Sequence, residues 1–281
     1  MEKLLQKCYL WTPEQLTTDI LATYQKQHFC IINFLYYAQI HAQQLFEEQS
    51  SHPKKWEKPN ETKQRKQYAE ILEKGDYLLP DGIALQLLYR YLTTFWFIQS
   101  TTSKLPNLNG TDFTPFFLKE TAKKIWKENI GVLCYGTKPE ILPKAYKFIE
   151  KMGIEVIYAQ DGYTPFDRWK AEKAIITANK STLILLQGRS TPTIPLQELR
   201  TQENYEKIKQ HQLIVMNVGG LFDWRGGGQK RAPLRIRKIK LERAWRLCSD
   251  PKRNFKKCLN TLYGPLFVIK ITRKRLFKKQ K

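Results

Sequence analysis

The sequence predicts an α/β fold, with a Rossmann-like, mostly parallel sheet followed by a basic, helical C-terminal appendage. Three observations predict it: apolar strand-like runs alternate with helix-like segments, glycines follow the apolar runs, and positive charge is concentrated near the end of the chain. Of the 281 residues, 42% are hydrophobic, which is enough for the core of one large domain. We expect an α/β domain over residues 1–238 and a basic amphipathic appendage over residues 239–281.

The first strand is predicted within residues 27–44, which begin as a β-rich apolar run and continue with helical spacing. Asn33 is then expected near the end of this strand. Residues 47–68 are polar and contain prolines, so we expect a surface insertion there.

Two strand-to-helix junctions follow. One apolar run stops at Asp81 and Gly82, where an amphipathic helix takes over. In residues 105–126, turn residues surround Gly110, and we expect a helix after Pro115.

Residues 129–163 predict a complete βαβ unit, with a strand, a turn at Gly136, a helix, and a second strand ending near Asp161. Such a crossover joins parallel strands. Residues 181–195 and 211–220 each contain a further apolar run that enters a turn. Strands of this kind gather their ligands at the carboxyl edge of the sheet.

The positive charge is localised. Residues 225–281 contain 20 Lys and Arg against two acids, and hold +18 of the chain's +22 formal charge. Aromatic and leucine side chains alternate with these cations, as in helices that lie in a membrane interface. We therefore expect an anionic membrane surface as a partner and no nucleic acid. A charged face that is simply solvated is the alternative.

Several classes of protein are disfavoured. The five cysteines show no paired spacing, which favours a reducing, cytoplasmic compartment, and no signal peptide or run of roughly 18 apolar residues is present. The four histidines have no metal-ligand spacing, and neither a GxGxxG nor a P-loop motif occurs. We therefore expect no metal and no cofactor.

Several segments, in order, resemble signatures of the WecG/TagA/CpsF family of bacterial glycosyltransferases. The likeness is strongest in NVGGLFDWRGGGQKRAP, LERAWRL and PKR, which are similar to the family's VGxxFDxxxGxxxRAP, LEWxxRL and PKR. It extends to LLPDGIAL, NGTDF, GVLCYGTKPEI with the downstream DGY, and PLQE, which is similar to PKQE. The resemblance as a whole covers roughly Phe29 to Leu276.

The resemblance implies an inverting, metal-independent transfer of N-acetylmannosamine, or a related N-acetylhexosamine, from a UDP-sugar to a polyprenyl-diphosphate-linked sugar. This reaction belongs to cell-surface polysaccharide or teichoic-acid-type synthesis. The resemblance also implies the GT-E fold, in which a Rossmann-like core is followed by an appendage that touches the membrane, so we expect a peripheral protein on the inner face of the cell membrane.

Asp81 matches the aspartate of the family's PDG or ADG segment, and the resemblance implies that it deprotonates the acceptor hydroxyl. An inverting displacement needs one carboxylate beside the attacking oxygen, with its pKa raised by burial from about 3.9 toward neutrality. The alternative is that Asp81 caps the following helix.

A second set of residues is expected to bind substrate. Glycines let the backbone approach a nucleotide, and the resemblance assigns the sugar pocket to an asparagine and a loop glutamine. Asp223 is expected at the nucleoside, or alternatively as a cap or a partner of Arg225 or Arg231. The predicted substrate-binding residues are Asn33, Gly136, Gln197, Gly219, Gly220, Asp223 and Arg231. Guanidinium groups pair phosphate oxygens in bidentate geometry, so Arg243, Arg246 and Arg253 are expected at the acceptor's diphosphate.

The chain departs from the family's pattern at two positions. Ile31 stands where the family has the threonine of its Thr-x-Asn element, and Asn107 stands where it usually has an arginine. The second departure removes a cationic phosphate contact, for which Arg189 or arginines near the C-terminus are the candidate replacements. Two alternatives stay open: a non-enzymatic nucleic-acid-binding protein, and a family member that has lost catalysis.

Overall fold

A computed structural model of the chain describes residues 12–36, 75–94, 105–189, 204–238 and 241–249, together with Pro251. The described residues fall into two compact units. The first contains the residues up to Asp81 and Pro106–Gln229, and the second contains Gly82–Leu105 and the residues from Lys230 onward. The boundary that the sequence predicts at residue 239 stays a prediction, as does the insertion at residues 47–68, which lies outside the described residues.

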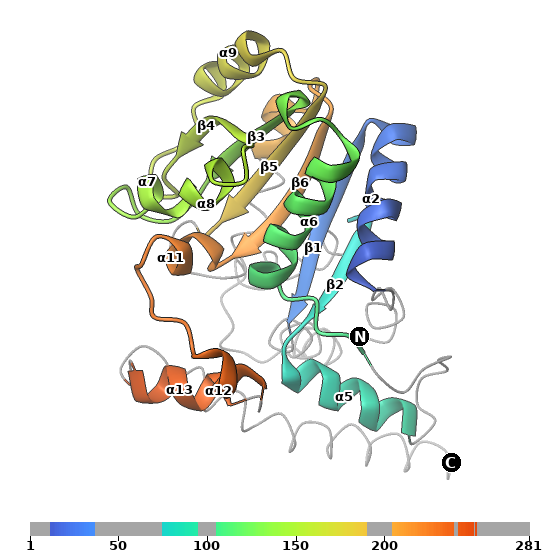
Figure 1. Cartoon of the computed structure of the whole chain (residues 1–281), viewed down its shortest axis with the longest axis vertical. Coiled ribbons are helices and arrows are strands. Elements are labelled where there is room, and N and C mark those ends of the chain that lie inside the picture. The colour runs from blue at the N-terminus through green and yellow to red at the C-terminus, as the bar shows by residue number, and fades with distance from the viewer. Residues whose placement is uncertain are drawn as a thin grey trace, which may run out of the picture. The chain divides into compact units, whose positions relative to one another are not determined.

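The first unit is built on one six-stranded sheet, in the order β2-β1-β6-β5-β3-β4 (Figure 1). All five pairings between neighbouring strands of this sheet are parallel. The strands are β1 (Phe29–Tyr36), β2 (Tyr77–Asp81), β3 (Ile130–Tyr135), β4 (Glu155–Gln160), β5 (Thr182–Gly188) and β6 (Leu213–Gly219). This sheet and its flanking helices confirm the predicted Rossmann-like α/β fold.

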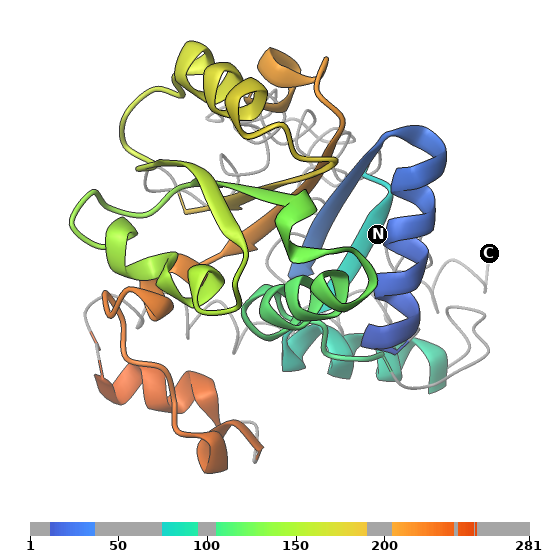
Figure 2. The same ribbon diagram turned by 45° about the horizontal axis from the view of Figure 1, so that its top comes forward.

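Helices cover both faces of the sheet, as Figure 2 shows. In the first unit they are α2 (Pro13–Gln27), α6 (Gly110–Lys124), η1 (Lys127–Asn129), α7 (Leu142–Ala145), α8 (Lys147–Glu150), α9 (Arg168–Ala178) and α11 (Leu221–Arg225). Residues 204–208 are also helical. The second unit contains α5 (Ile83–Thr94), α12 (Leu234–Lys238) and α13 (Glu242–Ser249).

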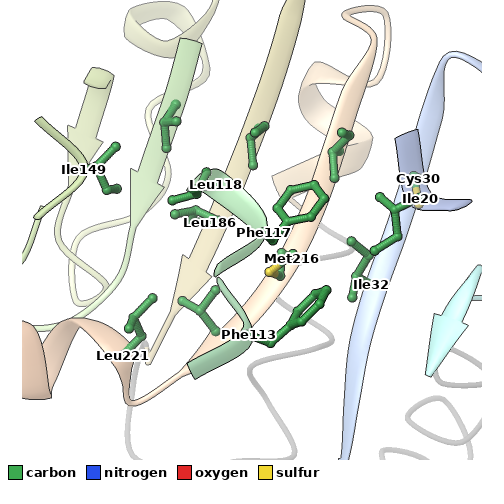
Figure 3. Packing of buried hydrophobic residues seen from close by; sticks show 14 of the residues in the cluster. Ile20, Cys30, Ile32, Phe113, Phe117, Leu118, Ile149, Leu186, Met216 and Leu221 are labelled. Atoms are coloured by element: carbon green, nitrogen blue, oxygen red, sulfur yellow. The ribbon is translucent and has the colours of Figure 1, made fainter. Parts of the chain in front are cut away.

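The core has one layer on each face of the sheet. On one face, side chains of α2, α6, α7 and α8 pack against alternate strand residues such as Ile32, Ile184 and Met216 (Figure 3). On the other face, α9 and residues 204–208 cover the intervening residues, such as Leu185 and Val215. Since β3 and β5 are buried along their whole length, their sequences are almost continuously apolar, which is typical of a parallel sheet covered on both faces.

Capping side chains fix where two helices begin. Thr12 and Gln15 form a capping box around the first turn of α2. Helix α6 begins at Gly110, because Asn109 accepts a hydrogen bond from the backbone of Asp112. The expectation of a helix that starts only after Pro115 was therefore wrong, since the capping asparagine starts it five residues earlier than that proline.

Candidate functional site

Glycines mark the carboxyl edge of the sheet, where a parallel α/β sheet binds its ligands. They follow or end five of the six strands: Gly82 after β2, Gly136 after β3, Gly162 after Asp161 and β4, Gly188 at the end of β5, and Gly219 at the end of β6. The predicted positions of Gly136, Gly219 and Gly220 at strand ends agree with this arrangement, and their contact with a nucleotide stays a prediction.

The ends of β3 and β5 approach so closely that only glycine fits there. A Cβ atom on Gly136, whose φ is +133°, would lie 2.6 Å from the carbonyl carbon of Gly188. A Cβ atom on Gly188 would lie 2.4 Å from the ring of Phe222. The chain leaves β3 toward β4 and leaves β5 toward β6, in opposite directions along the sheet. Such a point of reversal is where open α/β sheets bind ligands.

Three polar side chains meet beside this point. Thr137 is buried at φ +62° and donates its hydroxyl hydrogen bond to Oδ1 of Asp223 at 2.5 Å. Oδ2 of Asp223 lies 3.5 Å from Nη1 of Arg189. The carboxylate is 9% exposed and the arginine side chain 28% exposed, so a nearly buried anion is paired with a partly solvated cation.

Backbone hydrogen bonds connect the loops that carry these side chains. The N–H of Arg189 donates to the carbonyl of Gly219 at 3.0 Å, and the N–H of Thr137 donates to the carbonyl of Arg189 at 2.5 Å. The N–H of Gly162 in turn donates to the carbonyl of Thr137 at 2.9 Å. The ends of β4, β3, β5 and β6 therefore form one connected polar layer.

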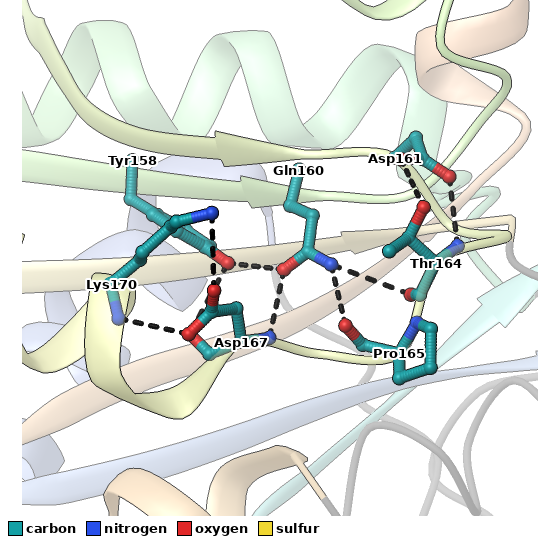
Figure 4. A network of polar contacts seen from close by, with 7 residues as sticks. All are labelled: Tyr158, Gln160, Asp161, Thr164, Pro165, Asp167 and Lys170. Atoms are coloured by element: carbon teal, nitrogen blue, oxygen red, sulfur yellow. Dashed lines mark hydrogen bonds and ion pairs between the residues drawn. The ribbon is translucent and has the colours of Figure 1, made fainter.

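The loop after β4 is held by its own polar groups (Figure 4). The carboxylate of Asp161 accepts hydrogen bonds from the backbones of Tyr163 and Thr164 and from the Thr164 hydroxyl, at 2.8 to 2.9 Å. Desolvation is the largest single influence on the pKa of Asp161 and raises it, but these hydrogen bonds together lower it below its usual value. The Gln160 amide accepts from the backbone of Asp167 and donates to the Pro165 carbonyl, which closes the loop.

Buried amide side chains lie on the neighbouring strands β1, β6 and β5, before the carboxyl edge of the sheet is reached. Nδ2 of Asn217 donates to Oδ1 of Asn33 at 2.6 Å, and Nδ2 of Asn204 donates to Oε1 of Gln187 at 3.2 Å. Asn33 is fully buried, and its own Nδ2 finds no hydrogen-bond partner among the described residues. The predicted sugar-pocket residue is therefore part of an amide network inside the sheet.

Asp81 is the last residue of β2 and is half-buried. Helix α5 begins at Ile83, which leaves Gly82 at the N-cap position and Asp81 one residue before it. Asn33 is aligned with Leu78 of β2, three residues before Asp81. At about 3.3 Å per residue, the two predicted site residues are separated by about 10 Å along the strand direction. Asp81 lies at the edge, and Asn33 lies deeper in the sheet.

The remaining predicted residues are placed only in part. Arg231 is half-buried in the second unit, and Arg246 pairs with Glu242 at 2.7 Å within α13. Arg243 belongs to the same helix, but its side chain lies outside the described residues, as do Gln197 and Arg253. Arg225, one of the alternative partners of Asp223, lies over the ring of Phe148, 4.9 Å from its centroid.

Sequence reasoning missed Thr137 and Asn217. Thr137 directly follows the glycine that ends β3, a position that often faces a ligand in this class of sheet. Asn217 is the polar residue in the otherwise apolar strand LIVMNVG, and a buried polar side chain in such a run requires a partner. Both signals are present in the sequence, but neither identifies the partner.

The described residues contain neither a cluster of metal ligands nor a membrane-spanning helix. No three His, Cys, Asp or Glu side chains come together there as metal ligands. Within the same residues, no helix combines the length and the apolar character that crossing a bilayer requires.

A family model described as "Glycosyl transferase WecG/TagA/CpsF family" matches residues 59–281. The match covers well over half of the chain. It includes Asp81, the strand ends of β2 to β6 and the basic C-terminal segment, whereas β1 with Asn33 precedes it.

Proposed function

Since the chain belongs to the WecG/TagA/CpsF family of glycosyltransferases, we propose that it transfers an N-acetylhexosamine, of the N-acetylmannosamine type, from a UDP-sugar to a polyprenyl-diphosphate-linked sugar. The family implies cell-surface polysaccharide synthesis, with a sugar nucleotide as donor and a lipid-linked acceptor. The identities of the nucleotide as UDP, of the sugar as an N-acetylhexosamine and of the lipid as a polyprenyl carrier are part of our proposal.

The observation that carries the proposal is the position of Asp81. It ends β2 within the matched segment, at the same edge of the sheet as the glycines of β3, β5 and β6. In the proposed reaction, Asp81 takes the proton of the acceptor hydroxyl as that oxygen attacks the anomeric carbon of the donor. The bond from this carbon to the β-phosphate oxygen breaks, and UDP leaves with the bonding electrons. A single displacement inverts the anomeric centre, and one carboxylate is sufficient for it.

The nucleotide is assigned to the ends of β3, β5 and β6. Gly136 directly follows β3 and Gly219 ends β6, and both allow the backbone to approach a ligand closely. UDP gains negative charge as it leaves, so polar donors and cations at this edge would lower the barrier.

We assign the acceptor to the basic C-terminal segment, residues 225–281. Residues 225–281 hold +18 of the formal charge, and each basic residue near an anionic leaflet contributes about 1 kcal/mol of attraction. We assign Arg243, Arg246 and Arg253 to the acceptor's diphosphate. We assign the other Lys and Arg residues of the segment 225–281 to the inner leaflet of the cell membrane.

A transfer assay tests the reaction. The full chain is incubated with a panel of radiolabelled UDP-sugars and a short-chain polyprenyl-diphosphate acceptor that carries one sugar. We expect label from a UDP-N-acetylhexosamine to enter the lipid fraction, with release of UDP. A failure of every UDP-sugar to label the acceptor would remove the proposed donor class and favour a member that has lost catalysis.

Binding to liposomes tests the assignment of the charge. The full chain should bind vesicles that contain phosphatidylglycerol better than vesicles of phosphatidylcholine alone, and salt should weaken this binding. Tight, steeply salt-dependent binding to duplex DNA without binding to anionic vesicles would favour the nucleic-acid alternative.

A further inference from the structure

The ion pair between Arg189 and Asp223 lies at the point of the sheet where a sugar nucleotide would bind. We propose that Arg189 contacts the diphosphate of the donor and that Asp223 is a positioning residue for Arg189 rather than a ligand of the nucleoside. The inference rests on the proposed function, because it takes the sugar nucleotide as given and assigns the cation that receives it.

The carboxylate of Asp223 is already engaged by the protein. Its Oδ1 accepts the hydroxyl hydrogen bond of Thr137 at 2.5 Å, and its Oδ2 lies 3.5 Å from Nη1 of Arg189. With only 9% of the side chain exposed, the negative charge requires a nearby cation. A ribose hydroxyl at Oδ1 would have to compete with Thr137, whereas Oδ2 accepts no hydrogen bond from the described residues and is stabilised by the charge of Arg189.

Arg189 is held at its base by neighbouring strand ends. Its N–H donates to the carbonyl of Gly219 and its carbonyl accepts from the N–H of Thr137, so its Cα is fixed between β3 and β6. The side chain then extends to Asp223 and keeps 28% of its surface in contact with solvent. An arginine whose backbone is held by two hydrogen bonds, and whose guanidinium lies beside Asp223 with part of the side chain in solvent, is suited to receive an anion.

The chemistry of the donor provides the reason for a cation here. A guanidinium binds phosphate oxygens through two parallel hydrogen bonds, and UDP gains charge as the glycosidic bond breaks. The resemblance places an arginine where this chain has the uncharged Asn107, so Arg189 would supply the cationic contact that Asn107 cannot. Among the described residues, Arg189 is the arginine that directly follows β5, at the reversal point of the sheet.

Calorimetry with the full chain tests the assignment of Arg189. Arg189→Ala should weaken UDP binding by about 10- to 100-fold, the loss expected for a hydrogen-bonded ionic contact. UMP, which lacks the β-phosphate, should lose less, and guanidinium chloride at millimolar concentration should partly restore UDP binding to the variant. Arg168→Ala is the matched control, because Arg168 pairs with Glu172 at 2.9 Å on the surface of α9 and should bind UDP like the parent.

A double-mutant comparison tests the role of Asp223. Asp223→Asn keeps an oxygen for Thr137 but removes the charge that holds Arg189. If Asp223 acts through Arg189, UDP binding by the double variant should equal that of Arg189→Ala alone. Additive losses, with uridine and UMP weakened as much as UDP, would show that Asp223 contacts the nucleoside and would overturn its positioning role.

Arg189→Lys and the UDP affinity of the parent protein separate a failure of this inference from a failure of the proposed function. Arg189→Lys keeps the charge but loses the planar fork, so it should show an intermediate loss even if the alanine variant proves unstable. If the parent binds UDP and transfers sugar while Arg189→Ala and Arg189→Lys bind UDP normally, the inference fails and the proposed function stands. If the parent does not bind UDP, both fail.

Discussion

Replacing Thr137 by valine isolates one hydrogen bond at the centre of the candidate site. Thr137 is 1% exposed and has φ +62°, a conformation that is unfavourable for any β-branched residue. Because threonine and valine are both β-branched and similar in size, the backbone strain is the same in the two proteins. The remaining difference is the hydroxyl that donates to Asp223 at 2.5 Å.

The expected loss in the free energy of unfolding follows from the burial of this hydrogen bond and the charge of its acceptor. A hydrogen bond to a charged group contributes about 1.5–3 kcal/mol, and here its loss leaves a nearly buried carboxylate with one donor fewer. We expect Thr137→Val to lower the free energy of unfolding of the first unit by about 2–3 kcal/mol. For a protein of this size, that is a fall in the unfolding midpoint of roughly 4–10 °C.

Urea unfolding followed by circular dichroism measures this loss, with Thr137→Ser as the matched control. Serine keeps the hydroxyl and removes one methyl group, so it should stay within about 1 kcal/mol of the parent. If valine and serine destabilise the protein equally, the hydrogen bond to Asp223 does not contribute what we infer, and the polar layer at the strand ends is not held in this way.

Three further perturbations follow from the same structure. Gly136→Ala forces a Cβ to within 2.6 Å of the Gly188 backbone at φ +133°, so it should cost more than about 3 kcal/mol and abolish UDP binding, measured by thermal unfolding and calorimetry. Asn217→Leu leaves Oδ1 of Asn33 without its donor and should cost about 2–3 kcal/mol, whereas the double variant that also replaces Asn33 by leucine should recover part of this loss. The lowered pKa of Asp161 makes its carboxylate stabilising above its usual pKa, and this contribution disappears as the pH falls through the folded-state value. The difference in unfolding midpoint between the parent and Asp161→Asn, measured from pH 7 down to about 2, should therefore be constant near neutrality and narrow below about pH 4, and a difference that is constant over the whole range would contradict this assignment.

Local sequence patterns were sufficient for the strands of the sheet. The apolar runs of β3, β5 and β6 are buried on both faces, which is why they are continuous enough to recognise. The start of α6 was misplaced because Pro115 was given more weight than the capping side chain of Asn109. Asn33 was expected near the end of the first strand, but β1 continues three residues beyond it, to Tyr36.

The sequence was sufficient to predict that the site lies at the carboxyl edge of the sheet. It was not sufficient to predict which side chains contact one another there. Glycines at strand ends indicated where a ligand would approach, and Asp81 was correctly expected at a strand-to-helix junction. The contact between Thr137 and Asp223 joins residues 86 positions apart, and that between Asn33 and Asn217 joins residues 184 apart. Such contacts depend on the order of the strands, which puts β6 between β1 and β5. A single sequence reveals the strands but not that order.

The turnover of Asp81→Asn with saturating UDP-sugar and lipid acceptor tests most directly whether Asp81 is the catalytic base. The amide is nearly the same size as the carboxylate but cannot accept the acceptor's proton, so we expect transfer to fall by at least about 100-fold while UDP affinity stays within about twofold. Glu206→Gln, a surface carboxylate paired with Lys209, is the control and should transfer sugar at the parent's rate. Equal turnover by Asp81→Asn and the parent would show that Asp81 is not the base and would contradict the central claim.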